Sequence, residues 1–446
     1  MQAGAGQVEE LCITGGTVLT MDEAGSLIPD GALLIRQGRI AYCGPTAALP
    51  PAADSTRRVL RARGGLIMPG LINAHTHAAM TLMRGLADDL PLDTWLNEHI
   101  FPAEKNLTPQ AVYWGAMLGC LEMIRSGITA FCDMYLFARQ VARAADDAGL
   151  RAVLGEVLYD FDSPSYGQID NGLALTRDFI AELAPHPRLS AAVMPHALYT
   201  CSRGLMERAG ALSAETGACL DIHLAENREE TAQVQKMWGA RPLAVLEDLG
   251  LVNERLWIDH GVDLNQAEIE RLAQAGARVA HCPESNMKLA SGVAPLPAML
   301  AAGVKVGLGT DGCASNNDQD LFGEMDSCAK LAKAANLDPT AAPAEAVVGL
   351  CTSRGAVAFG LPGELGVLRP GALADVIVLD TDRPHLTPMY NPLSHLVYAA
   401  RGSDVVHTVC HGRVLMAEGV VEVMDQEEVV AKARQQAMAL TGREVL

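Results

Sequence analysis

Two histidines one residue apart are the feature of this sequence whose types and spacing most clearly suggest chemistry. His75 and His77 stand in the run N-A-H-T-H, which begins at Asn73 and ends an apolar segment. If this segment is a β-strand, its side chains alternate between two faces, so both imidazoles lie on the same face. They could then bind one metal ion, although isolated histidines are also common in cores and on surfaces. The pair alone leaves both interpretations open.

Two further residues could complete a set of metal ligands. His223 ends the apolar run in D-I-H-L-A-E, and Asp311 ends the run in G-L-G-T-D-G. Three neutral imidazole nitrogens and one carboxylate suit Zn²⁺, and ligand type alone leaves Fe²⁺ or Mn²⁺ open. A single Asp after a strand more often caps the next helix. All four candidates lie at the ends of apolar runs. We therefore predict a metal site formed by His75, His77, His223 and Asp311.

Three other side chains at the ends of runs could act on a substrate. Glu226 lies three residues after His223, close enough to face the same cavity without binding the ion, so we predict that it moves protons. His260 and His281 follow two later runs and could polarise water or the reacting group. Either could instead be a structural histidine. We expect a catalytic role for His260 and leave both roles open for His281.

These residues share one position in a repeated pattern. Between about residues 67 and 366, short apolar runs alternate with longer segments of helical periodicity, as expected of βα units around a parallel sheet. Eight such units predict a (β/α)8 TIM barrel, whose active site is built at the carboxyl ends of its strands. The eight runs are LIMPGLINAHTH, GITAFCDMY, RAVLGEVLYD, LSAAVMPHAL, CLDIHLAE, LWIDHG, RVAHCP and KVGLGTDG.

Both ends of the chain have a different texture. Residues 1–66 and residues 367–446 contain short β-type runs broken by Gly and Pro, including LADVIVLD and VVHTVCHGRVLMAEG. The latter run predicts a hairpin with Gly412 in its turn. We therefore predict that the two ends together form a small β-sandwich domain, followed by a C-terminal helix.

Composition narrows the classes of partner. The 446 residues include 34 Lys and Arg against 53 Asp and Glu, so the net charge of −19 repels nucleic acids and anionic membranes. Eleven cysteines without a C-x-x-C pair favour a reducing compartment. No signal-like start and no apolar stretch of about 18 residues is present, so we expect a cytoplasmic enzyme. The expected partner is a small molecule, and assembly into a homo-oligomer is left open.

Longer stretches around these residues resemble the amidohydrolase superfamily. Within it, the sequence is most similar to the 5'-methylthioadenosine/S-adenosylhomocysteine deaminases, from about residue 10 to about residue 435. The closing run GVLRPGALADVIVLD resembles that superfamily's return into its small β domain. The stretches that carry the resemblance are PGLINAHTHAAMTLMRGLADDLPLDTWLNEHIFPAE, HLAE, VAHCPESNMKLASG and GLGTDGCASNN.

The resemblance implies roles for individual residues. The four predicted ligands match a mononuclear zinc site, and the fourth strand run ends without a lysine that could bridge a second metal. Glu226 and His260 match the proton-transfer pair, and Asp311 is expected to take the proton of the attacking water. Glu104 matches an acidic residue that binds the ribose hydroxyls, and His196 matches a histidine that contacts the substrate. Glu226, Asp311 and His281 are also expected to contact the substrate.

The implied reaction is hydrolytic, zinc-dependent deamination of the 6-amino group of adenosine-type nucleosides such as 5'-methylthioadenosine, S-adenosylhomocysteine or adenosine, with ammonia as the second product. One departure concerns Gln168, which stands where relatives have a substrate-binding arginine. It predicts that uncharged 5' groups are handled as well as a homocysteine carboxylate, or better. Alternatives are deamination or dechlorination of guanine, cytosine or a triazine, and a metal-binding protein without activity. Without the family resemblance, Glu104 would be interpreted as an exposed residue at the start of a solvated helix.

Overall fold

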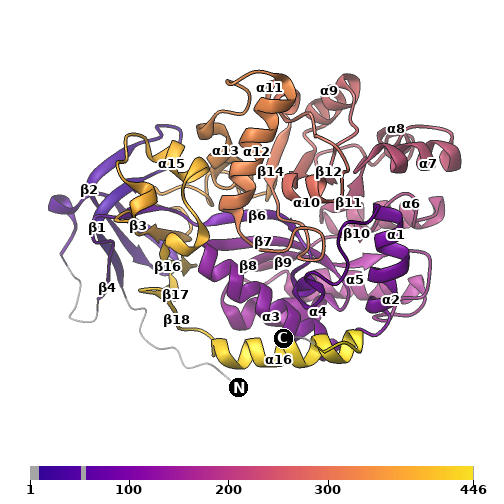
Figure 1. Ribbon diagram of the computed structural model, residues 1–446, viewed down its shortest axis with the longest axis horizontal. Coiled ribbons are helices and arrows are strands. Elements are labelled where there is room, and N and C mark those ends of the chain that lie inside the picture. The colour runs from indigo at the N-terminus through magenta and orange to yellow at the C-terminus, as the bar shows by residue number, and fades with distance from the viewer. Residues whose placement is uncertain (1–9, 52–56, 445–446) are drawn as a thin grey trace.

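The strands of the central part of the chain form two parallel sheets. The computed structural model describes residues 10–51 and 57–444, and within them the sheet orders are β10-β8-β7-β6, with β9 beside β8, and β11-β12-β13-β14 (Figure 1). The strands are β6 (Leu71–Thr76), β7 (Ile128–Tyr135), β8 (Arg151–Leu158), β9 (Leu189–Ala191), β10 (Met194–Pro195), β11 (Leu220–Leu224), β12 (Leu256–His260), β13 (Arg278–His281) and β14 (Lys305–Leu308).

The two sheets meet at both edges. Ala197, just after β10, forms a parallel bridge with His223 on β11. At the other edge, the backbone N–H of Asp311, after β14, donates to the carbonyl of His75 on β6 at 3.0 Å. Strands and intervening helices thus enclose an α/β barrel of the TIM type, as predicted.

The run LIMPGLINAHTH contains two strands, and its prediction as a single barrel strand was wrong. β5 (Leu66–Pro69) belongs to a different sheet from β6, and Gly70 separates them. A Cβ atom at Gly70 would lie 2.2 Å from Oγ1 of Thr129, so only glycine allows this close approach to β7. Pro69, which has no N–H, ends β5 next to that glycine.

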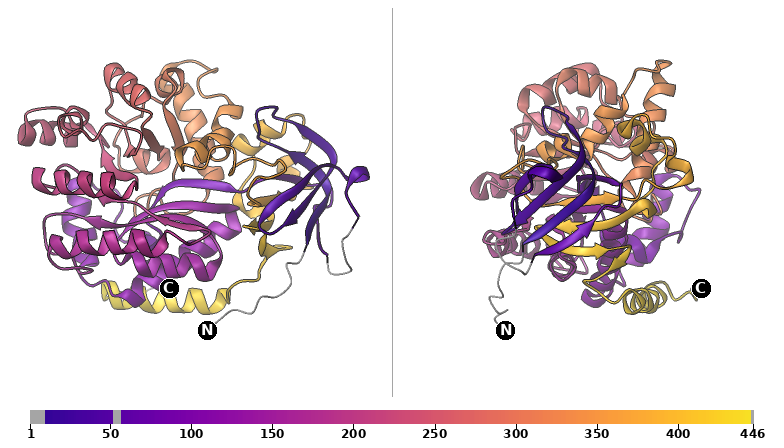
Figure 2. Two further views of the ribbon diagram at one scale, coloured as in Figure 1. Left: turned by 180° about the vertical axis from the view of Figure 1, so that it is seen from behind. Right: turned by 90° about the vertical axis from the view of Figure 1, so that its left-hand side faces the viewer.

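Strands from both ends of the chain join in one sheet, as predicted. Its order is β18-β17-β16-β15-β5-β1-β2-β3, with β4 also paired to β1 (Figure 2). The first nine residues of the predicted N-terminal part lie outside the described residues. The strands are β1 (Leu11–Leu19), β2 (Leu27–Arg36), β3 (Arg39–Pro45), β4 (Arg58–Arg61), β15 (Val376–Leu379), β16 (Val405–Cys410), β17 (Arg413–Ala417) and β18 (Val420–Val421).

The predicted hairpin at Gly412 is confirmed. β16 and β17 pair antiparallel, and the two residues between them, His411 and Gly412, have φ values of 50° and 75°. Two successive positive φ angles are typical of the tight turns whose twist matches that of the flanking strands.

Helices surround the barrel, and the last one lies along its outside. α16 packs against α3, where Asn106 also donates to the carbonyl of Leu440 at 3.3 Å (Figure 1). In the described parts of the chain, no helix combines the length and apolar character needed to cross a bilayer. The helices are α1 (Leu92–Thr94), α2 (Phe101–Glu104), α3 (Pro109–Ser126), α4 (Ala138–Ala148), α5 (Ile169–Leu183), α6 (Arg203–Thr216), α7 (Arg228–Trp238), α8 (Pro242–Asp248), α9 (Gln266–Ala275), α10 (Pro283–Lys288), α11 (Leu296–Ala302), α12 (Leu321–Asn336), α13 (Ala344–Leu350), α14 (Ser353–Ala358), α15 (Pro392–Tyr398) and α16 (Gln426–Thr441).

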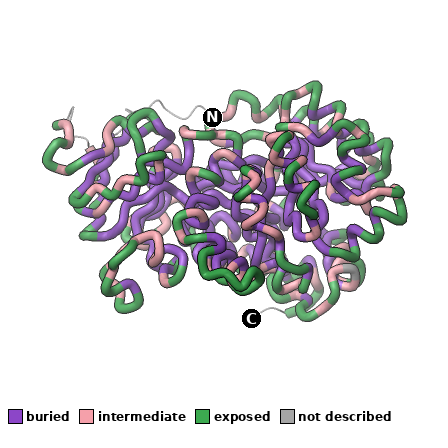
Figure 3. The backbone as a smooth tube through the Cα atoms, turned by 90° about the horizontal axis from the view of Figure 1, so that it is seen from above, coloured by how far each residue is buried: buried purple, intermediate pink, exposed green. Residues whose placement is uncertain are grey.

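The larger of two apolar cores extends from the barrel into the sheet, through Ile377, Val405 and Leu415 among others, and a buried ion pair also joins the two parts. The larger core follows the barrel strands and their helices, and the smaller lies in the sheet built from the chain ends (Figure 3). Arg151 at the start of β8 reaches Asp375, just before β15, through two N–O contacts of 3.1 Å. This two-pronged, charge-assisted contact fixes the barrel against the sheet.

Candidate metal and substrate site

The predicted metal ligands lie together at the carboxyl ends of the barrel strands. Nε2 of His75 lies 3.4 Å, and Nε2 of His77 3.2 Å, from Oδ1 of Asp311. Nε2 of His223 lies 3.4 Å from Nε2 of His77. Donor atoms of His75, His77 and His223 all lie within 4.8 Å of one another, and so do those of His75, His260 and Asp311. Donors on β6, directly after β6, on β11 and in the loop after β14 therefore lie close together around His75.

The second nitrogen of each ring shows that this group fits a metal ion. Nδ1 of His77 lies 2.5 Å from the carbonyl of Met134, and Nδ1 of His223 lies 2.9 Å from that of His196. A carbonyl only accepts, so each Nδ1 carries the hydrogen, and each neutral ring offers an unprotonated Nε2. Two such lone pairs facing each other at 3.4 Å repel unless a cation lies between them. The arrangement is that of histidines prepared to bind a metal.

Asp311 is held as a charged carboxylate. Oδ2 accepts from the hydroxyls of Ser285 at 2.7 Å and Ser315 at 2.8 Å, while Oδ1 accepts from the N–H of Gly312 at 2.8 Å. Burial by itself would raise the pKa of Asp311, but contacts with His75 and the neighbouring imidazole outweigh burial and leave that pKa well below its ordinary value. Asp311 is therefore ionised at neutral pH and can bind a cation or accept a proton.

Glu226 lies beside this group with the opposite tendency. Burial, followed by repulsion from Asp311, raises the pKa of Glu226 well above its ordinary value, so the carboxyl group tends to be protonated. Its backbone is held by Glu230, whose side chain accepts from the N–H of Glu226 at 2.6 Å and from the N–H of Ala225 at 3.2 Å. A protonated and an ionised carboxyl side by side could act as acid and base.

His260 faces the cavity, whereas His281 does not line it. Nδ1 of His260 lies 3.0 Å from Oδ1 of Asn286, which leaves Nε2 free to face the ion or a water molecule. His281 is buried at the end of β13, and burial with repulsion from His260 lowers its pKa to about 4. Within the described residues, His281 is absent from the cavity lining.

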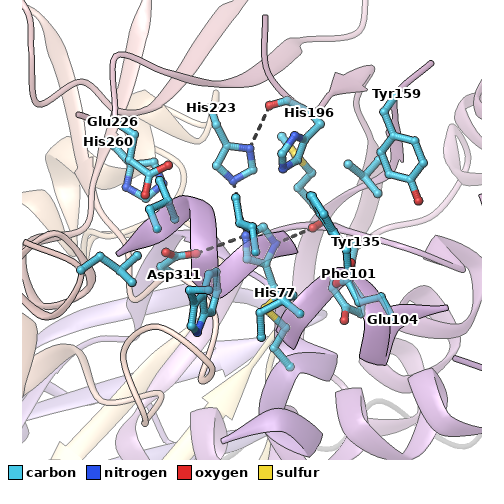
Figure 4. A pocket seen from close by; sticks show the side chains of 18 of the residues that line it. His77, Phe101, Glu104, Tyr135, Tyr159, His196, His223, Glu226, His260 and Asp311 are labelled. Atoms are coloured by element: carbon cyan, nitrogen blue, oxygen red, sulfur yellow. Dashed lines mark hydrogen bonds and ion pairs between the residues drawn. The ribbon is translucent and has the colours of Figure 1, made fainter. Parts of the chain in front are cut away.

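One cavity of about 630 Å³ contains both the metal group and the predicted substrate residues. Glu226, His260 and Asp311 lie on one side of it, and Glu104 on the other, with His77 and His223 between them (Figure 4).

Glu104 ends α2 and is buried, in contrast to the solvated helix start that was the alternative interpretation. Burial raises its pKa to about 7, and a hydrogen bond with the Tyr135 hydroxyl only partly opposes this shift. Nearby, Nδ1 of His196 lies 2.9 Å from Oγ1 of Thr200, and burial lowers the pKa of His196 to about 3. This end of the cavity thus offers a carboxyl group and a neutral imidazole as hydrogen-bonding groups.

An aromatic wall lies where this cavity opens into a wider outer one. Phe101 lines both cavities, and its ring centroid lies 5.8 Å from that of Phe161. Phe161 stacks on Tyr159 with centroids 3.8 Å apart, yet 44% of Phe161 is exposed. Gln168 is exposed and bonds Asp162 at 3.1 Å. Among the described residues, neither cavity is lined by an arginine.

Several site residues were not found from the sequence. Tyr135 ends β7, and Tyr159 and Phe161 follow β8, where apolar character predicted only core. Phe101 begins the short helix α2. Glu230 lies in the first turn of α7, where acidic residues commonly favour the helix dipole. Asp259 directly precedes His260 and contacts Nδ1 of His75 at 3.1 Å. Its place next to a candidate histidine was the one available signal.

Comparisons with known proteins agree with this geometry. The sequence profile of the amidohydrolase family matches residues 66–415. The chain is 55% identical over 426 residues to the 5-methylthioadenosine/S-adenosylhomocysteine deaminase of Syntrophobacter fumaroxidans, covering 95% of this chain and 97% of that protein. It is 43% identical to the 5'-deoxyadenosine deaminase of Methanothermobacter thermautotrophicus, and the match covers 97% of this chain and 99% of that protein.

A solved structure is also similar throughout its length. The zinc-bound adenosine deaminase of Xanthomonas campestris is 36% identical in sequence and superposes with a TM-score of 0.94. The match covers 98% of this chain and 99% of that structure. The fold, the metal group and these relatives define a metal-dependent aminohydrolase. The chain belongs to the amidohydrolase family.

Proposed function

We propose that this protein hydrolyses the 6-amino group of adenosine-type nucleosides, such as 5'-methylthioadenosine, S-adenosylhomocysteine and adenosine, to the inosine-type product and ammonia. The observation that carries this proposal is the shared cavity, in which Glu104 lies across from Glu226 and Asp311. A free base has no diol for Glu104 to bind, whereas a nucleoside presents the base and the diol together. The names of relatives at 55% and 43% identity support the same substrate class.

The proposed cofactor is one zinc ion, bound by His75, His77, His223 and Asp311. The donor set of three neutral imidazoles and one carboxylate supports zinc, and Fe²⁺ or Mn²⁺ could substitute. When bound, the ion would act as a Lewis acid that makes a water molecule nucleophilic at neutral pH.

Protons would move through the two carboxyl groups beside the ion. Asp311, held ionised, takes the proton of the attacking water. Glu226, held protonated, donates to the ring nitrogen next to the carbon under attack and later regains a proton from the new hydroxyl group on that carbon. The departing amine leaves as ammonia with the proton that Asp311 took from the water, a transfer that Glu226 assists. His260, oriented by Asn286, positions the water. His281 would act indirectly, through its neighbour His260.

The remaining residues would select the nucleoside. Glu104 accepts hydrogen bonds from the two ribose hydroxyls, and His196 forms a further polar contact with the substrate. The 5' group then points toward the outer cavity, past Phe101 and Phe161. The aromatic rings favour an apolar methylthio group, whereas Lys105 and Lys288, which also line the outer cavity, provide cations for an amino-acid carboxylate.

A turnover screen tests this function. Zinc-replete protein is mixed separately with 5'-methylthioadenosine, adenosine, S-adenosylhomocysteine, guanine and cytosine, and both the ultraviolet absorbance change and ammonia are measured. The proposal expects turnover of the nucleosides. Turnover of guanine or cytosine alone would instead support the amino-heterocycle alternative.

We also propose that the two chain ends form one β-sandwich domain beside the barrel domain, with the first boundary after Pro69 rather than after residue 66, because β5 pairs with β15 through Pro69. Pairing of β1 and β5 with each other, and of β5 with β15, supports a single unit made of both chain ends. Limited proteolysis followed by mass mapping would test the division.

A further inference from the structure

Two carboxylates lie inside the barrel, beneath the metal group. Asp221 on β11 and Asp259 on β12 are both 0% exposed. Barrel interiors are normally filled by branched apolar side chains, and a buried carboxylate is costly unless it has a partner. Asp259 therefore needs a structural or functional reason for its position.

His75 supplies that reason. Oδ1 of Asp259 lies 3.1 Å from Nδ1 of His75, and both side chains are fully buried. The other nitrogen of the same ring, Nε2, points to Asp311 at 3.4 Å. A carboxylate at Nδ1 favours the tautomer in which Nδ1 carries the hydrogen, so Nε2 has a lone pair for the ion.

The other two histidines are oriented in a different way. Nδ1 of His77 and Nδ1 of His223 donate to backbone carbonyls, which no side-chain substitution removes. Strand pairing places Asp259 opposite His223 in the β11–β12 register, so it enters the barrel next to the ligand group. His75 is thus the one of these three ligands whose orientation depends on a side chain, and on a charged one.

We propose that Asp259 is a positioning residue that fixes the tautomer and orientation of His75 and thereby sets the affinity of the metal site. A carboxylate partner also makes the imidazole a stronger donor than a carbonyl partner does. This inference rests on the proposed metal site but not on the proposed substrate. Metal binding is measured without any nucleoside, so failure of the deaminase assignment and failure of this inference give different results.

The test compares zinc affinity with the stability of the metal-free protein. Asp259→Asn and Asp259→Ser both remove the charge, and two variants ensure that the test does not depend on one of them folding. Asp221→Asn is the matched control, because it makes the same change at an equally buried carboxyl group that contacts Asp259 and, at 3.5 Å, Cys132, whereas the ion pair with His75 is formed by Asp259. Zinc Kd is measured by competition with a chelator, and Tm is measured for each metal-free form.

We expect the Asp259 variants to bind zinc about 10- to 100-fold more weakly than the wild type, the usual loss when the partner of a metal-binding histidine is removed. Their metal-free Tm should stay the same or rise, because a buried charge has been removed. A purely structural role would give the reverse pattern, with a lower metal-free Tm and an unchanged Kd. Asp221→Asn should alter Kd by less than about threefold.

Three results would overturn the proposal. One is a wild-type zinc Kd in both Asp259 variants. Another is an equal loss of affinity in Asp221→Asn, which would assign the effect to the buried charge pair. The third is binding of two ions per wild-type chain, because donor atoms of His75, Asp221 and Asp259 also lie within 4.8 Å of one another and could hold an ion themselves.

Discussion

Nε2 of His77 and Nε2 of His223 face each other at 3.4 Å, while each ring donates its Nδ1 hydrogen to a backbone carbonyl. This relationship supports the proposal that the two rings bind a metal ion and do not form a hydrogen bond with each other. Neither nitrogen has a hydrogen to offer the other when both rings are neutral. A cation between them turns this repulsion into attraction.

Removing one of these rings should remove the metal and the activity together. His223→Ala is expected to lower bound zinc and deaminase turnover in parallel, because three donors remain where four converged. Metal content is measured by atomic emission after gel filtration, beside the rate of ammonia release. Full retention of both zinc and activity would contradict the ligand assignment.

Glu226 should affect turnover without affecting the metal. Glu226→Gln keeps the shape of the side chain but removes the acidic proton, so kcat should fall by about 100-fold or more, the usual scale for a general acid. Zinc content and Tm should match the wild type. If kcat stays near the wild-type value, another group delivers the proton to the ring.

Glu104 should affect recognition of the sugar. Glu104→Gln removes a charged acceptor from a buried position, so kcat/KM for 5'-methylthioadenosine should fall by about one to three orders of magnitude, corresponding to one or two charge-assisted hydrogen bonds. A 2',3'-dideoxy analogue is the matched control, because it never forms these bonds and should lose much less. Equal losses on both substrates would show that Glu104 does not bind the ribose.

Phe161 should affect only the 5' group. Phe161→Ala is expected to lower kcat/KM for 5'-methylthioadenosine by about tenfold, since an apolar group of one or two heavy atoms loses its contact. Adenosine, with a 5' hydroxyl, should change by less than about threefold. Phe161→Arg should shift the preference toward S-adenosylhomocysteine. The same loss on all three nucleosides would mean that Phe161 supports the wall without contacting the 5' group.

The position of residues relative to strand ends explains which parts of the site could be predicted. His75, His77, His223 and Asp311 were found because the ends of parallel strands meet at one rim of a barrel, whatever the details of packing. The division of LIMPGLINAHTH into two strands was missed because the pair Pro69 and Gly70, at which β5 ends before β6 begins, was not treated as a strand boundary.

Residues that act through tertiary contacts could not be found in this way. The burial of Glu104 depends on how α1 and α2 fold over the mouth of the barrel. The sequence around Glu104 predicts an exposed side chain. Phe101 and Phe161 lie far apart in the chain, so no periodicity indicates that their rings meet. Asp259 resembles any polar residue beside a histidine until the 3.1 Å contact with His75 is known.

The most direct test of a metal-dependent deaminase is a zinc titration of the metal-free protein with 5'-methylthioadenosine present and ammonia release followed. The account predicts no turnover without zinc, a linear rise in rate up to one equivalent per chain, and a plateau beyond it. It also predicts that each nucleoside consumed releases one ammonia. Ammonia release by the metal-free protein, a rise that continues to two equivalents, or no release at any zinc concentration would contradict it.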